Sequence, residues 1–155
     1  MNASYLAGVA CGCLLAAAVC APAAYAGTTV IDDSGSLPYN APLTLHWLPP
    51  LRGAGQATVI GTTSVRVHLN VTPWLHRSGR IYLMLPAQQP GALTASWSTQ
   101  GRLLAGRLTS GSRTLVYSGP ISTAFIEDVL QLTLNIDARQ LQQLYPINFQ
   151  FQMEQ

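Results

Sequence analysis

Apolar and polar residues alternate along most of the chain from residue 42 onward. The clearest run lies near the end and consists of Leu130, Leu132, Leu134 and Ile136, separated by polar residues. Because successive side chains of a strand point to opposite faces, this alternation predicts a β-strand with one dry face. By the same criterion we expect strands close to residues 43–47, 65–71, 81–85, 93–97, 103–108, 115–117 and 147–153.

Glycine, proline and serine residues separate these runs roughly every ten residues. Short alternating runs between regular turns are typical of all-β proteins. We therefore predict an antiparallel β-sandwich of about seven to nine strands, of the Ig-like or Greek-key type. Residues 137–144 differ, because their apolar side chains have helical spacing, with Asp137 as the N-cap and Pro146 as the stop. We expect one or two turns of helix there.

Two of the three tryptophans fall on the dry faces of predicted strands. Trp47 is in phase with Leu45, and Trp97 is in phase with Leu93 and Ala95. A tryptophan on a dry face buries a large apolar area, so both rings are predicted to belong to the core.

The first 26 residues have the composition of an export signal. Residues 6–24 are almost entirely Ala, Leu, Val, Gly and Cys, and Ala24-Tyr25-Ala26 places small residues where a signal peptidase selects them. A membrane anchor is the alternative, since a spanning helix needs about 20 apolar residues, but Pro22 and the cleavage site favour removal. No Lys or Arg precedes the apolar run, so either the free amino group suffices or the true start lies upstream.

Removal of this signal defines the expected mature chain. It begins at Gly27, has no stable membrane span and is exported to the periplasm, the medium or the cell surface. All three cysteines, Cys11, Cys13 and Cys20, lie in the signal, so the mature chain is disulfide-free. No repeat or change of composition divides the remainder. We predict an irregular N-terminal arm over residues 27–41 and a single sandwich domain over residues 42–155.

The basic residues are eight arginines, with no lysine. Seven of them occur between Arg52 and Arg113, a stretch without Asp or Glu, and all six acids lie outside it. One interpretation is a basic surface for an anionic partner such as a glycan. The other is that arginines on the wet faces of strands oppose edge-to-edge pairing, while acids from both ends fold back beside them. A net charge of only +2 and the lack of a binding motif argue against nucleic acid.

The sequence contains no arrangement of residues that predicts catalysis. His46, His68 and His76 are not at the spacings that place two imidazoles on one metal ion. Glu127 and Asp128 are adjacent, so on a strand they point to opposite faces and do not share a substrate. The chain also lacks a Gly-x-Ser-x-Gly motif and a phosphate-binding glycine loop. We predict a protein that is not an enzyme, with no catalytic residues, no metal and no cofactor.

The best indication of ligand binding is the loop-like stretch at residues 72–77. Trp74 follows Pro73, and His76 and Arg77 come shortly after it. An exposed aromatic ring can stack on a sugar, and arginine binds carboxylate or phosphate with a planar fork of donors. Trp74, His76 and Arg77 are therefore the predicted ligand contacts. The alternative is a tryptophan that caps the end of the sandwich.

Alternation without catalytic chemistry indicates a structural or protein-interaction role in the cell envelope or on the cell surface, such as a fimbrial subunit or an assembly accessory. The expected partners are other envelope or surface proteins, or a second copy bound through an edge strand. The alternative function is a soluble periplasmic or extracellular binding module for a glycan or another anionic ligand.

Overall fold

The computed structural model describes residues 27–39, 44–48, 58–87, 93–137 and 148–155. This part of the chain contains ten β-strands and one 3-10 turn, η1, at Thr72–Trp74. The strands are β1 (Thr28–Val30), β2 (Leu37–Pro38), β3 (Thr44–Leu48), β4 (Thr58–Asn70), β5 (Ser78–Met84), β6 (Thr94–Thr99), β7 (Gly106–Thr109), β8 (Arg113–Pro120), β9 (Phe125–Asp137) and β10 (Gln150–Glu154). The predicted signal and, apart from Asp137, the predicted helix lie outside the described residues. No helix in the described ranges is long and apolar enough to cross a membrane.

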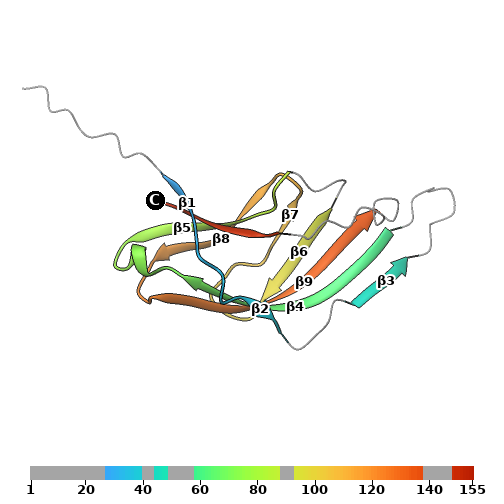
Figure 1. Ribbon diagram of the computed structural model, residues 1–155, viewed down its shortest axis with the longest axis horizontal. Helices are drawn as coiled ribbons and strands as arrows, with labels where there is room; N and C mark the ends of the chain where they lie inside the picture. Colours follow the sequence, from blue (N-terminus) through green and yellow to red (C-terminus); the bar gives the residue numbers. More distant parts are fainter. Residues whose placement is uncertain (1–26, 40–43, 49–57, 88–92, 138–147) are drawn as a thin grey trace, which may run out of the picture.

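The strands form two antiparallel sheets that lie over one another (Figure 1). One sheet has the strand order β1-β10-β5-β8. The other has the order β2-β4-β9-β6-β7, and β3 pairs with β4 on the same edge as β2. The predicted all-β sandwich is therefore confirmed.

The core lies between the sheets and follows the alternation in the sequence. Every second residue of β9 from Ile126 to Leu134 is buried, and Phe151 and Met153 of β10 are buried against them from the other sheet. Burial of apolar side chains of this size stabilises the fold by about 1.5–3 kcal/mol each. The dry faces predicted for these two strands are confirmed.

The N-terminal arm, which was predicted to be irregular, forms two short strands. β1 pairs with β10 in one sheet, and β2 pairs with β4 in the other. Between them the chain crosses the side of the sandwich at residues 31–36, which we call the crossing segment. The Ile31 N–H donates to the Phe151 carbonyl at 2.8 Å, and the Asn70 N–H donates to the Asp32 carbonyl at 3.0 Å. Strands of three and two residues are too short to show a period, which explains why the described strands outnumber the prediction.

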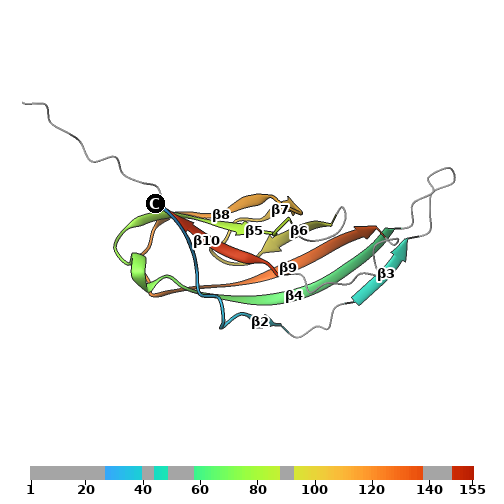
Figure 2. The same ribbon diagram turned by 45° about the horizontal axis from the view of Figure 1, so that its top comes forward.

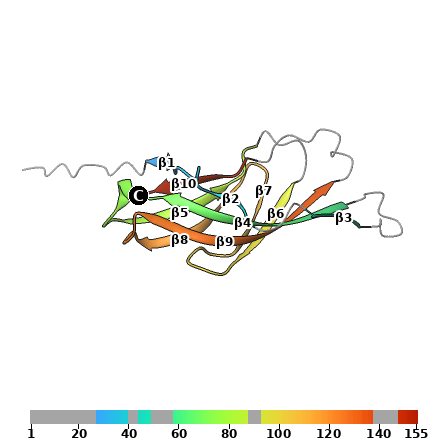
Figure 3. The same ribbon diagram turned by 60° about the horizontal axis from the view of Figure 1, so that its bottom comes forward.

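The longest strands, β4 and β9, have 13 residues each and pair along their whole length. Figures 1, 2 and 3 show that one end of this ribbon, together with β3, projects beyond the strands of the other sheet. The two layers of the sandwich are therefore unequal in extent. Val59 and Leu134 at the projecting end are buried, whereas all of β3 beside them is exposed.

This difference corrects one prediction about the tryptophans. Trp97 is buried, with 4% of its surface exposed, as expected. Trp47 is 65% exposed, so its assignment to the core is wrong. The Trp47 side chain does point to the predicted face of the sheet. Trp47 lies opposite the buried Val59, and directly opposed residues of neighbouring strands share a face. The physical reason for its exposure is that the second sheet ends before it reaches β3 (Figure 2).

Candidate functional site

The predicted ligand residues lie in one turn at the end of the sandwich. Trp74 ends η1 and its ring, half-buried, packs against the core. His76 is exposed and has a φ of 63°, and its N–H donates to the Ile121 carbonyl at 2.8 Å. Arg77 is also exposed and reaches the side chain of Gln155 at 3.4 Å. The orientation of Trp74 is that of a cap on the core, and a ligand at these three residues stays a prediction.

Several arginines are held by neighbouring side chains on the faces of the sheets. Glu154, from the C-terminal strand, lies 3.0 Å from Arg113 and 3.8 Å from Arg80. The guanidinium of Arg113 also lies over the ring of Tyr82, 4.4 Å from its centroid. These contacts show an acid from one end of the chain beside the central arginines. An anionic partner for the remaining positive surface stays a prediction.

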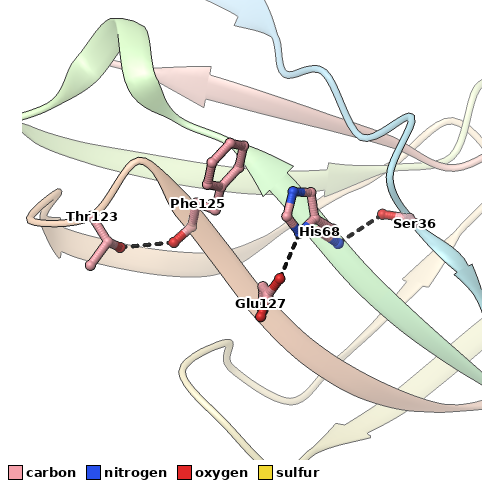
Figure 4. Close-up of polar contacts among 5 residues, drawn as sticks. All are labelled: Ser36, His68, Thr123, Phe125 and Glu127. Carbon is pink, nitrogen blue, oxygen red and sulfur yellow. Dashed lines mark hydrogen bonds and ion pairs between the residues drawn. The ribbon is translucent and has the colours of Figure 1, made fainter.

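His68 and Glu127 form a polar pair that the sequence did not reveal (Figure 4). The two residues are directly opposed on β4 and β9, and Nδ1 of His68 lies 2.7 Å from Oε1 of Glu127. The His68 ring stacks on Phe125 with 4.6 Å between centroids. A carboxylate at Nδ1 fixes the tautomer and leaves Nε2 to accept or donate a proton. The sequence did not indicate this pair, because the register of β4 against β9 depends on residues far apart along the chain.

The hydroxyl of Ser36 does not complete a catalytic arrangement with this pair. Oγ of Ser36 accepts the backbone N–H of His68 at 2.9 Å, so it bonds to the main chain and not to the ring (Figure 4). Glu127 has 66% of its side chain exposed, and an exposed pair of this kind contributes at most about 1 kcal/mol. In the described ranges, no three His, Cys, Asp or Glu side chains gather closely enough to hold a metal ion. We interpret His68 and Glu127 as a cross-strand pair on the wet face of the sheet.

A small apolar hollow of about 100 Å³ opens between β4 and β10, beside the crossing segment. Val65, Val67, Leu130 and Phe151 contribute to its lining, and Asp33 also lines it. Burial raises the pKa of Asp33 above its ordinary value. Asp32, beside it, has its pKa lowered by hydrogen bonds from Ser34.

These opposite shifts predict opposite effects on stability. Because the pKa of Asp33 is raised in the folded state, its protonated form favours folding. The contribution of Asp33 to the free energy of unfolding is therefore greatest below about pH 4 and falls as the pH rises through its folded pKa. Asp33→Asn should therefore raise the urea midpoint at pH 7 and leave it unchanged near pH 3. Asp32→Asn is the control of opposite sign: Asp32 stabilises above its unfolded pKa, so this variant should lower the midpoint at pH 7. Equal shifts in one direction would contradict the assignment.

Among the described strands, β3 (Thr44–Leu48), which we call the β3 edge, has the largest number of exposed large apolar side chains. All five residues are exposed, with Leu45 at 46%, Trp47 at 65% and Leu48 at 46%. One side of β3 pairs with Thr58–Thr62 of β4, and no described strand pairs with its other side. The β3 edge therefore presents an apolar strand to the surroundings of the protein.

The chain as a whole matches no protein-family model, no curated protein and no solved structure. The fold defines a two-sheet antiparallel β-sandwich protein.

Proposed function

We propose that the protein is an exported, non-enzymatic β-sandwich with a structural or protein-interaction role in the cell envelope or on the cell surface, and that it binds its partner through the β3 edge. The observation that carries this proposal is the exposure of three large apolar side chains on one uncharged edge strand. A strand edge of this kind is a template for pairing with another chain, and apolar exposure adds a driving force.

The other sheet edges carry features that oppose strand addition. β2 contains Pro38, β7 contains Arg107, and β8 begins with Arg113 and ends with Pro120. Charged residues and prolines on an edge are the usual protection against unwanted pairing. β1 has only three residues, and β3 has neither a charge nor a proline. Among the described edges, β3 is thus the one that is suited to a partner.

The export part of the proposal is supported by the apolar segment and the Ala24-Tyr25-Ala26 cleavage pattern. An Ig-like arrangement is supported by the chain crossing between the sheets from β4 to β5 and again from β9 to β10. Of the two specific forms of this role, a fimbrial subunit and an assembly accessory, we favour the assembly accessory, because such proteins are exported and associate through strand edges.

Photo-crosslinking in cells that export the protein tests this function. A photoreactive amino acid replaces Leu45 on the β3 edge or, as the control, Leu104, an exposed leucine of similar accessibility, 46% against 49%. We expect a discrete protein adduct from position 45 and none from position 104. The same adducts from both positions, or none from either, would contradict an interaction through β3. Intact mass of the recovered protein should correspond to a chain that begins at Gly27, and an uncleaved chain would remove the export part.

A further inference from the structure

The β3 edge is complementary to itself. Its sequence, Thr44-Leu45-His46-Trp47-Leu48, places apolar side chains at equal distances on either side of the central histidine. When two such strands run antiparallel with His46 opposite His46, Leu45 of each lies opposite Trp47 of the other. Directly opposed side chains share a face, and pairs of an aromatic with an aliphatic residue are among the favourable ones.

The shared face continues the apolar face of the sheet, which is buried at Val59 and Leu134 and exposed at Leu45 and Trp47. Leu45 and Trp47 lie opposite Gly61 and Val59 of β4, which in turn lie opposite Leu134 and Ile136 of β9. This is the projecting end of the sheet, beyond the strands of the second layer (Figure 3). A second copy would bring another Leu45 and Trp47 to the same face, so that each copy covers part of the other's exposed apolar area.

Electrostatics does not oppose this pairing. β3 and its partner segment Thr58–Thr62 contain no Asp, Glu, Lys or Arg, so no like charges meet across the two-fold axis when the two opposed His46 imidazoles are neutral. Edge strands that avoid self-pairing often carry a charged residue, and the edge strand β7 carries Arg107. The β3 edge therefore lacks the feature that would prevent a sheet from continuing into a second copy.

We propose that β3 pairs with β3 of a second copy, antiparallel and centred on His46, to form a two-fold symmetric dimer with one continuous sheet. This inference rests on the proposed function, because it names the partner of the same edge. A symmetric contact of this type closes on itself and produces a dimer, not a filament. With five residues from each copy the interface is small, so we expect a dissociation constant between about 1 μM and about 1 mM.

Cysteine crosslinking tests the register. Opposed residues of antiparallel strands have Cα atoms about 4.5–5.5 Å apart, within the range that a disulfide spans. Purified, processed His46→Cys protein should therefore form a covalent dimer under mild oxidation. Thr44→Cys is the matched control on the same strand: its two thiols would be displaced by four residues, or about 13 Å, along the strands and should not join. Equal crosslinking of both variants would overturn the register.

Sedimentation equilibrium of the processed protein, from about 10 μM to about 1 mM, tests the dimer without a covalent bond. We expect the average mass to rise toward that of a dimer with concentration. Trp47→Lys places a charge in both apolar pairs and should keep the protein monomeric, whereas Leu104→Lys, an equivalent change at an exposed leucine elsewhere, should not. Circular dichroism of each variant verifies that it is folded.

The outcomes separate this inference from the proposed function. A protein that stays monomeric to about 1 mM, while position 45 still crosslinks to a different protein in cells, overturns the homodimer and keeps the interaction role. A monomer that gives no adduct in cells overturns both. An adduct in cells with the mass of two copies, together with the concentration-dependent dimer, supports both.

Discussion

Replacement of Trp97 by alanine should lower the free energy of unfolding by about 3–5 kcal/mol, the cost typical of deleting a buried tryptophan. The ring is 4% exposed, and its Nε1–H donates to the Leu104 carbonyl at 2.9 Å. Gly106 packs so closely against it that a Cβ at this position would lie 2.7 Å from the ring. The variant therefore loses a large apolar contact and leaves the Leu104 carbonyl without this donor.

Urea denaturation followed by circular dichroism measures this loss, and Trp47→Ala is the matched control. Trp47 is the same residue type and is also in phase with an apolar face, but it is 65% exposed. Its replacement should change the free energy of unfolding by less than about 0.5 kcal/mol at low protein concentration. If the two variants lost similar stability, β3 would have to be covered by the rest of the chain, which would contradict the exposed β3 edge.

Asp128→Ala should produce the second largest loss of stability, about 1.5–3 kcal/mol. Asp128 is 7% exposed, and its carboxylate accepts the N–H of buried Leu103 at 2.8 Å and that of Val129 at 2.7 Å. Hydrogen bonds to a charged acceptor are stronger than neutral ones, and removal of the acceptor leaves the buried Leu103 N–H without a partner.

Glu127→Ala is the control for Asp128, because the two residues are adjacent on β9 and face opposite sides. Glu127 is exposed and contacts His68 on the wet face, so its loss should cost at most about 1 kcal/mol. Chemical denaturation of both variants at neutral pH makes the comparison. A larger effect for Glu127→Ala would mean that the His68 pair is structurally more important than its exposure indicates.

The opposite orientation of Glu127 and Asp128 was predictable from the sequence, and the structure confirms it. The role of Asp128 was not, because Leu103 is 25 residues away along the chain and the acid lies in phase with apolar residues. The pairing of His68 with Glu127 was hidden for the same reason, since 59 residues separate them. Trp74, His76 and Arg77 were expected together because they are neighbours in sequence. That the Trp74 ring packs against the core depends on the surrounding strands.

Alternation and the regular spacing of turn residues determined that this protein is an all-β sandwich, and alternation determined which residues point toward the same side of each strand. It does so because side-chain direction in a strand depends only on the backbone of that strand. Whether a dry face is covered depends on where the opposing sheet begins and ends, and that is decided by strand pairing across the whole molecule. Trp97 and Trp47 have the same phase, and only the extent of the second sheet buries one and exposes the other.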